Sequence, residues 1–323
     1  MATQEQRRNG KHNNVISIGS CEQDVVALVE LLKGCAKKKD LCKGSRLHAH
    51  ILNRGLHKKN SYVASSLINM YAKCGAIKEA EEVLQDLSVR DVVSWSTLIA
   101  GYVQEGQGNE ALNGYEQMQR EGISPNEVTF SCVLKACGNM AAFDKGKQIH
   151  NEVIHMGLLD RNVMLGTALV EMYAKCGFLG KAHKVLQELP FRNVACWNAL
   201  IMRYARHEGG HEALNCFEQM RREDISPNEV TFVCILKACG TTGAVDKGKQ
   251  IHDEIIDRSL LKKNIVLGNA LVDMYAKCGL LAKAQQVLEE LPARDLVSWN
   301  ALISGYAKQG HGYEALNAFK KMQ

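Results

Sequence analysis

Three short motifs in this sequence carry residue types that enzymes use for metal and phosphate chemistry. The segments 150–152 and 252–254 read His-Asn-Glu and His-Asp-Glu. Zinc-dependent deaminases use a His-x-Glu of this kind, but they also need Pro-Cys-x-x-Cys, which the sequence lacks. Residues 243–249 spell G-x-x-x-x-G-K, yet Gln250 replaces the Ser or Thr that holds magnesium, and no strand is predicted before it. We therefore predict no catalytic residues, no enzyme activity and no cofactor.

The 12 cysteines form a second apparent metal-binding set. Two series repeat at intervals of 102 residues: Cys35, Cys137 and Cys239, and Cys74, Cys176 and Cys278. No two cysteines have the Cys-x-x-Cys spacing that is typical of zinc sites. The regular interval instead predicts small core residues on helices and no metal site.

Composition limits the partners of the chain. Apolar residues make up 46% of the 323 residues, which excludes a disordered protein. The net charge of +5 suits a polyanion, although a protein that coats DNA would be more basic, and we predict no DNA partner. No apolar run approaches 18 residues, so no membrane partner is predicted either.

The first 24 residues differ from the rest of the chain. Residues 1–20 contain Arg7, Arg8 and Lys11 but one acidic residue, Glu5. This composition is mildly similar to that of an organellar transit peptide, but no clear amphipathic stripe accompanies it. Two interpretations stay open for the segment 1–24: an N-terminal tail that is part of a transit peptide, or a solvated tail.

Internal repetition positions all of these residues. The segment Met-Tyr-Ala-Lys-Cys-Gly occurs at 70–75, 172–177 and 274–279, and the three tryptophans are also 102 residues apart. Aligning residues 92–193 with 194–295 gives 62 identities in 102 positions. An interval of this length is too long for one helical hairpin, so we expect it to divide into smaller structural repeats.

Each 102-residue interval divides into segments of 35, 36 and 31 residues, the first set being 92–126, 127–162 and 163–193. Within 92–126, apolar residues recur at helical spacing on both sides of a turn that contains Gly106 and Gly108. Two antiparallel helices of this size cannot bury an apolar stripe alone, but stacked neighbours can. The sequence therefore predicts an all-α protein, a superhelical solenoid of stacked antiparallel helix pairs.

These lengths and motifs resemble the P, L and S repeats of plant pentatricopeptide-repeat (PPR) proteins of the PLS subclass. The motifs that carry the resemblance are Val-Val-Ser-Trp-Ser-Thr-Leu-Ile-Ala-Gly-Tyr at 92–102, Gly-Ile-Ser-Pro-Asn at 122–126, Gly-Lys-Gln-Ile-His at 146–150 and the three Met-Tyr-Ala-Lys-Cys-Gly segments. Tetratricopeptide repeats have a similar length, but their Trp-x-x-Leu-Gly-x-x-Tyr pattern is absent. The resemblance implies a right-handed superhelical α-solenoid, a PPR array over residues 25–323.

The resemblance also assigns the individual repeats and their order. We expect 25–60 (L), 61–91 (S), 92–126 (P), 127–162 (L), 163–193 (S), 194–228 (P), 229–264 (L), 265–295 (S) and 296–323 (P, incomplete). Domains that carry RNA-editing activity follow such arrays in this family, and none follows here. We therefore expect a fragment or truncated product without a C-terminal editing domain.

Members of this family read one RNA base per repeat with two side chains, one early in the first helix and one at the end of the repeat. The residues at these two positions of the P and S repeats in this sequence form the pairs Ser65 with Asp91, Ser96 with Asn126, Thr167 with Asn193, Asn198 with Asn228 and Asn269 with Asp295. Asn300 follows without its partner. The family's preferences predict the RNA sequence G-A-N-A-C(or U)-N-U-pyrimidine, from 5′ to 3′. The two unread positions belong to the L repeats, where Val233 cannot form a hydrogen bond with a base edge.

Two further sets of residues follow from the resemblance. The side chains expected to sandwich each base are Tyr62, Val93, Met164, Ala195, Val266 and Val297. The basic side chains expected near phosphate are Lys73, Lys175, Arg206, Lys277 and Lys308. Each set has a structural alternative: Asn and Asp before a helix are good N-caps, aliphatic residues pack, and lysines at a helix end interact with its dipole.

The predicted function is sequence-specific binding of single-stranded organellar RNA in RNA processing. The resemblance favours the recognition arm of C-to-U editing or another maturation step, with an editing deaminase supplied in trans as an implied partner. It implies a mitochondrial or chloroplast location, and we lean towards the mitochondrion. The alternative is a protein–protein interaction scaffold with no RNA role, as tetratricopeptide arrays have.

Overall fold

The computed structural model describes residues 21–160, 162–206, 209–262 and 264–323. These residues form 19 α-helices and one 3₁₀ helix, Leu260–Lys262, and no strand occurs among them. The prediction of an all-α fold is confirmed. The part of the predicted N-terminal tail that spans residues 1–20 lies outside the described residues. None of the helices described is both long and apolar enough to cross a membrane.

The chain divides into two compact units, which we describe separately. The first unit holds residues up to 105 together with 113–124, and the second holds 106–112 and 125–323. The helices of the first unit are α1 (Cys21–Lys38), α2 (Leu41–Asn53), α3 (Leu56–Lys59), α4 (Ser61–Lys73), α5 (Ile77–Gln85) and α6 (Val92–Gln104). The helix α7 (Gly108–Arg120) has residues in both units. In the first unit α4 packs against α1, α5 and α6.

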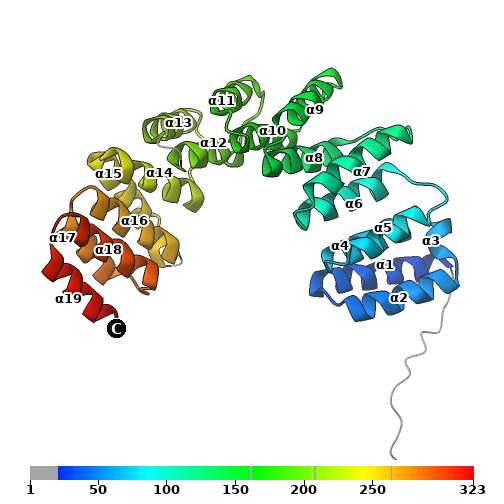
Figure 1. Ribbon diagram of the computed structural model, residues 1–323, viewed down its shortest axis with the longest axis horizontal. Helices are drawn as coiled ribbons and strands as arrows, with labels where there is room; N and C mark the ends of the chain where they lie inside the picture. The colour runs from blue at the N-terminus through cyan, green and yellow to red at the C-terminus, as the bar shows by residue number, and fades with distance from the viewer. Residues whose placement is uncertain (1–20, 161, 207–208, 263) are drawn as a thin grey trace, which may run out of the picture. The chain divides into compact units, whose positions relative to one another are not determined.

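The second unit is a succession of helix pairs (Figure 1). Its helices are α8 (Glu127–Met140), α9 (Phe143–His155), α10 (Val163–Lys175), α11 (Leu179–Glu188), α12 (Val194–Arg206), α13 (Gly210–Arg222), α14 (Glu229–Thr242), α15 (Val245–Asp257), α16 (Ile265–Lys277), α17 (Leu281–Glu290), α18 (Leu296–Lys308) and α19 (Gly312–Met322). The even-numbered helices contact one another in chain order from α8 to α18. We call these helices, together with α4 and α6 of the first unit, the first helices. Each odd-numbered helix packs against the first helix that precedes it. The unit is thus a solenoid of stacked helix pairs.

Side-chain caps begin the first helices. The side chains of Asp91, Asn126, Asn228 and Asp295 accept hydrogen bonds from backbone N–H groups in the first turns of α6, α8, α14 and α18, and each completes a capping box. The Asn or Asp that precedes these helices therefore has a structural role. At the other end, the repeated Met-Tyr-Ala-Lys-Cys-Gly segment closes a helix, because its Gly177 adopts a left-handed conformation with φ +85°.

Glycine and histidine in the Gly-Lys-Gln-Ile-His motif fix each 36-residue segment to its successor. A Cβ placed on Gly146 of α9 would lie 2.5 Å from Sδ of Met172 on α10, so a larger residue would require the Met172 side chain to move. One turn further along α9, Nδ1 of His150 lies 2.9 Å from the hydroxyl of Tyr173. The same pairing recurs between His252 and Tyr275, at 3.0 Å. Two motifs that are separate in sequence therefore form one contact between consecutive helix pairs.

Candidate nucleic-acid interface

The second residue of each first helix is apolar and exposed. The predicted sandwich residues have exposed fractions of 54% for Tyr62, 51% for Val93, 74% for Met164, 54% for Val266 and 60% for Val297, and Ala195 is also exposed. Exposed apolar side chains are common one at a time, but their recurrence at a fixed helical position within each unit marks an interaction surface. We call this row the apolar ladder.

The apolar ladder has two members that the sequence analysis missed. Val128 on α8 and Val230 on α14 are also second residues of first helices, with exposed fractions of 56% and 45%. Both lie in the 36-residue segments, for which the sequence predicts no RNA base. The signal was present in the sequence, because Val128 and Val230 follow the caps Asn126 and Asn228 at the same distance and are 102 residues apart.

The first residues of the predicted reading pairs lie one helical turn beyond the apolar ladder and are mostly buried. Exposed fractions are 7% for Ser65, 4% for Ser96, 7% for Asn198 and 8% for Asn269, while Thr167 is half-buried and Asn300 is exposed. The hydroxyls of Ser65, Ser96 and Thr167 each donate to the carbonyl four residues earlier, at 2.8, 2.6 and 2.8 Å. A hydroxyl whose proton is committed in this way meets a ligand as an acceptor.

The structure brings two predicted reading pairs into direct contact. In the pair of Asn198 and Asn228, Nδ2 of Asn198 donates to Oδ1 of Asn228 at 3.0 Å. In the pair of Asn269 and Asp295, Nδ2 of Asn269 donates to Oδ2 of Asp295 at 3.1 Å. These contacts show that residues 30 and 26 positions apart in sequence meet on one surface.

In the pairs of Thr167 with Asn193 and of Ser65 with Asp91, the side chains have hydrogen-bond partners in their own or the next first helix. Thr167 and Asn193 both contact Cys196: the Thr167 hydroxyl lies 3.0 Å from the Cys196 Sγ, and Oδ1 of Asn193 accepts from the Cys196 backbone N–H at 3.0 Å. Asp91 accepts from the Ser94 backbone N–H at 2.8 Å as the cap of α6, which packs against the helix that carries Ser65. Ser96 and Asn126 belong to different units, and we describe them individually.

A third side chain joins the pair of Asn198 and Asn228. Thr231 on α14 is fully buried, and its Oγ1 lies 2.7 Å from Oδ1 of Asn198 and 3.0 Å from Oδ1 of Asn228. Oδ1 of Asn228 also accepts the backbone N–H of Thr231 at 3.1 Å. Both amide oxygens of this pair therefore have hydrogen-bond donors within the protein.

The pair of Asn269 and Asp295 lacks such a third side chain. Ser298 occupies the position of Thr231, but its hydroxyl donates to the backbone carbonyl of Asp295 at 2.8 Å. Oδ1 of Asn269 is buried and has no hydrogen-bond partner among the described residues. The Ser298 backbone N–H, followed by the Asn269 amide, holds the pKa of Asp295 below its ordinary value. Asp295 is therefore a carboxylate at neutral pH.

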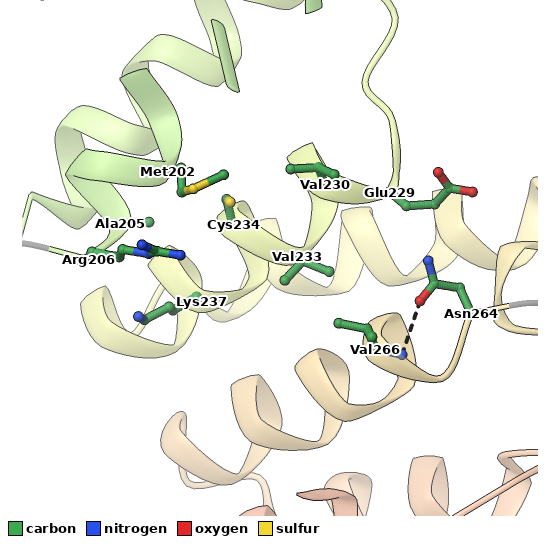
Figure 2. A pocket seen from close by; sticks show the side chains of 10 residues that line it. All are labelled: Met202, Ala205, Arg206, Glu229, Val230, Val233, Cys234, Lys237, Asn264 and Val266. Atoms are coloured by element: carbon green, nitrogen blue, oxygen red, sulfur yellow. Dashed lines mark hydrogen bonds between the residues drawn. The ribbon is translucent and has the colours of Figure 1, made fainter. Parts of the chain in front are cut away.

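A pocket of about 400 Å³ opens between α12, α14 and α16 (Figure 2). Two members of the apolar ladder, Val230 and Val266, line it, and Val233 and Asn264 lie between them. Figure 2 shows Arg206 and Lys237 together at the other side of the pocket. This volume lies within the range of about 300–1,000 Å³ that is typical of small-molecule sites. The 229–264 segment, whose Val233 offers no hydrogen bond, thus still contributes to a cavity that two members of the apolar ladder line.

The predicted phosphate-contacting residues occupy the last turn of the first helices. Three of them have protein partners: Nζ of Lys73 donates to Gln104 at 2.8 Å, Nζ of Lys175 to Asn139 at 3.0 Å, and Nζ of Lys277 to Asp273 at 2.6 Å. Gln104 on α6 and Asn139 on α8 occupy the position that these lysines have on their own helices. Arg206 lines the pocket, and Lys308 is exposed.

The apparent metal-binding residues have structural roles. His150 and His252 contact tyrosine hydroxyls, and burial lowers the pKa of both imidazoles. Burial raises the pKa of the Cys137, Cys216 and Cys239 thiols to about 12, so these thiols are protonated at neutral pH. Over the described part of the chain, no group of three or more His, Cys, Asp or Glu residues could hold a metal ion.

Comparison with known proteins finds sequence profiles of one repeat family along the chain. The sequence profile described as "PPR repeat family" matches residues 90–139 and 192–241, and the profile described as "PPR repeat" matches 62–92, 167–194, 269–296 and 297–323. Two pentatricopeptide repeat-containing proteins of Arabidopsis thaliana, one mitochondrial and one chloroplastic, are 39% and 37% identical over 91% and 90% of this chain. The chain spans 46% and 47% of the length of these relatives.

A solved structure shares the fold. The crystal structure of the pentatricopeptide repeat protein PPR10 in complex with an 18-nucleotide psaJ RNA element matches 93% of this chain and 48% of that chain, with a TM-score of 0.73 and 18% sequence identity. At this level of identity the match establishes the all-helical solenoid and not the residues that contact a ligand.

Proposed function

The chain belongs to the pentatricopeptide repeat family, and from this premise we propose that it binds single-stranded RNA in a sequence-specific way. The observation that carries the proposal is the combination of two rows on the first helices. An exposed apolar side chain is followed, one turn later, by a buried polar side chain, as in Val266 and Asn269. Unstacked bases bind proteins through apolar contacts on their faces and hydrogen bonds at their edges, and repeats of this kind read one base each.

The hydrogen-bond directions of the reading pairs favour particular bases. Thr167 meets a ligand as an acceptor, because its hydroxyl donates to the Val163 carbonyl, and Oδ1 of Asn193 is occupied by the Cys196 backbone N–H. The pair therefore offers an acceptor and the amide N–H donors of Asn193. The Watson–Crick edge of adenine, with a donating amino group and an accepting N1, fits this arrangement. Geometry and the family's preference agree on adenine for this pair.

The pair of Ser65 and Asp91 offers acceptors on both sides. The Ser65 hydroxyl donates to the Ser61 carbonyl, and a carboxylate has no proton to give. Guanine presents two neighbouring donors, N1–H and the amino group, and fits best. By the same logic the pair of Asn269 and Asp295 offers a donor and an acceptor, which fits uracil. These assignments support the proposed RNA sequence G-A-N-A-C(or U)-N-U-pyrimidine.

The proposal also covers the subclass of the repeats and the cellular role of the chain. We assign the segments to the P, L and S repeats given above, and the recurring lengths of 35, 36 and 31 residues support this. Relatives with mitochondrial and chloroplastic names support a location in one of these organelles. A recognition arm for C-to-U editing, with the deaminase supplied in trans, is the role that fits the PLS assignment. The chain would contribute binding and not catalysis.

A gel-shift experiment tests RNA binding and its register together. The chain is mixed with an RNA that contains GANACNUC and with the same RNA in which both adenines are guanines. We expect preference for the first RNA, and reversal of that preference by Asn126→Asp combined with Asn193→Asp. Equal binding to both RNAs would mean that the register is wrong or that binding is non-specific.

Salt dependence separates RNA binding from the protein-scaffold alternative. An RNA complex that uses Arg206, Lys237 and the other basic side chains releases counterions, so its affinity should fall steeply as salt rises. A protein partner held by the apolar ladder would show little dependence on salt. Absence of RNA binding even at low salt would refute the proposed function and favour the scaffold.

A further inference from the structure

Thr231 is a fully buried side chain at the junction of two helix pairs, and no base-reading role has been assigned to it so far. We propose that Thr231 is a positioning residue that makes the pair of Asn198 and Asn228 select cytosine over uracil. This inference rests on the proposed function, because it concerns how one reading pair chooses its base. Thr231 itself would not touch the RNA.

The hydroxyl of Thr231 has one proton and several neighbours. Its shortest contact is 2.7 Å to Oδ1 of Asn198, and the contact to Oδ1 of Asn228 is 3.0 Å. The hydroxyl oxygen also accepts the backbone N–H of Asn228 at 3.2 Å. Since a hydroxyl donates once, the shorter contact identifies Asn198 as its main acceptor.

This hydrogen bond determines which way the amide of Asn198 points. With Oδ1 held by Thr231, Nδ2 of Asn198 lies towards Asn228, to which it donates at 3.0 Å. Rotating the amide by a half-turn would place an N–H group against the hydroxyl and oxygen against oxygen at Asn228. The 7% exposed fraction of Asn198 leaves no solvent to compensate for these losses.

The amide of Asn228 is constrained as well. Its Oδ1 accepts from the backbone N–H of Thr231 at 3.1 Å and from Nδ2 of Asn198 at 3.0 Å. Both amides of the pair therefore meet a base as N–H donors. Cytosine presents two adjacent acceptors, N3 and O2, to such a pair, whereas uracil carries a proton on N3 that would face a donor. The pair thus rejects uracil only while Asn198 cannot rotate.

The equivalent position in the pair of Asn269 and Asp295 provides the contrast. Ser298 lies at the third position of α18, as Thr231 does in α14, but its hydroxyl donates to the Asp295 carbonyl. Oδ1 of Asn269 has no partner in the described residues, so only the bond from its Nδ2 to Asp295 holds its amide, and no hydroxyl of the next helix takes part. Ser298 is therefore a helix cap without a positioning role, and it supplies a matched control.

The test measures base preference and not affinity alone. The chain and its variants compete for two RNAs that contain GANACNUC and differ only by C or U at the fifth position. Thr231→Val removes the hydroxyl and keeps the shape. We expect the preference for C over U to fall about fivefold in this variant, in line with the loss of one hydrogen bond, while Thr231→Ser keeps most of it.

Ser298→Ala is the matched control, because it also removes a capping hydroxyl. We expect it to leave the preference at the seventh position, for U over C, unchanged. Thermal unfolding of each variant reports any loss of stability, and the ratio of two RNAs on one protein is insensitive to a reduced folded fraction. Only a positioning role predicts that Thr231→Val changes the ratio and Ser298→Ala does not.

The outcomes distinguish this inference from the function on which it rests. RNA binding with an unchanged C-to-U ratio in Thr231→Val would overturn the role of Thr231 and leave the proposed function intact. A change of equal size in Ser298→Ala at its own position would overturn it too, because capping alone would then explain both. Failure of the unmodified chain to bind either RNA would refute the proposed function and this inference together.

Discussion

The pairs at Asn198 and Asn269 start from the same residue type and reach different hydrogen-bonding states. Both asparagines are buried, both donate Nδ2 to the last residue of their segment, and both are followed by a capping residue on the next first helix. Oδ1 of Asn198 accepts from Thr231, whereas Oδ1 of Asn269 has no partner in the described part of the chain. Both amide oxygens of the first pair have donors before a ligand arrives, and the amide oxygen of the second pair does not.

This difference shows that a reading pair is not defined by its two residues alone. A hydroxyl from the following helix can occupy the amide oxygen and leave only donors for the base. Where the hydroxyl donates to its own backbone, as in Ser298, the amide oxygen has no donor among the described residues. An unsatisfied buried carbonyl costs about 1–3 kcal/mol, so a ligand that supplies its donor gains correspondingly.

The largest expected effect comes from replacing Asn228, which forms a pair with Asn198. Asn228→Asp replaces a donor by a carboxylate and gives the pair the chemistry found at Asn269. We expect the preference at the fifth RNA position to change from C to U, by roughly thirtyfold overall, because a charged acceptor is worth more than a neutral one. Competition binding with RNAs that differ only at this position measures the change. Retention of the preference for C would show that the pair does not read this base.

Replacing each asparagine by leucine should destabilise the protein by different amounts. Asn198→Leu breaks two internal hydrogen bonds and should destabilise the protein by about 2 kcal/mol. Asn269→Leu breaks one hydrogen bond, to Asp295, but also removes a buried oxygen that has no partner, so we expect a destabilisation of less than about 1 kcal/mol. Urea unfolding of the two variants, without RNA, measures both changes. Equal destabilisation would mean that the two asparagines are equally well satisfied, contrary to the comparison.

The apolar ladder also differs between the two pairs. Ala195 lies three residues before Asn198, whereas Val266 lies three residues before Asn269. Ala195→Val adds two methyl groups that a bound base would cover, and we expect RNA affinity to rise by about 1 kcal/mol, or fivefold. Binding titrations at constant salt check this gain. The control Val266→Ala should weaken binding by a similar factor.

The smallest expected effect concerns the pH dependence of the base preference at the seventh RNA position. The pKa of Asp295 is held below its ordinary value, so this carboxylate contributes its stabilisation at any pH above the ordinary value and loses it only as pH falls through the lowered one. Between pH 7 and pH 5 we therefore expect no change in the preference for U at the seventh RNA position. Binding measured at both pH values tests this. A preference that fades over this range would mean that Asp295 titrates there and lacks the Ser298 and Asn269 hydrogen bonds.

Much of the fold could be predicted because its signals are local and recur. Helical apolar spacing, glycine breaks and Asn or Asp caps appear three times with little change, so the helix pairs and the exposed residues Val93, Met164 and Val297 follow from the sequence. Val128 and Val230 were missed, since attention to hydrogen bonding excluded the 36-residue segments from the apolar ladder. The contact between the Gly-Lys-Gln-Ile-His and Met-Tyr motifs was also missed, because it joins residues 23 positions apart.

The sequence by itself determined the repeat, the helices, the caps and the residue type at every candidate reading position, because each depends on neighbours within one or two turns. Only the tertiary structure decided which atoms of those residues remain for a ligand. Thr231 and Asn198 are 33 positions apart, and their hydrogen bond exists because α12 and α14 pack together. A buried amide has two possible orientations, and the one that it adopts depends on donors and acceptors from the neighbouring helix.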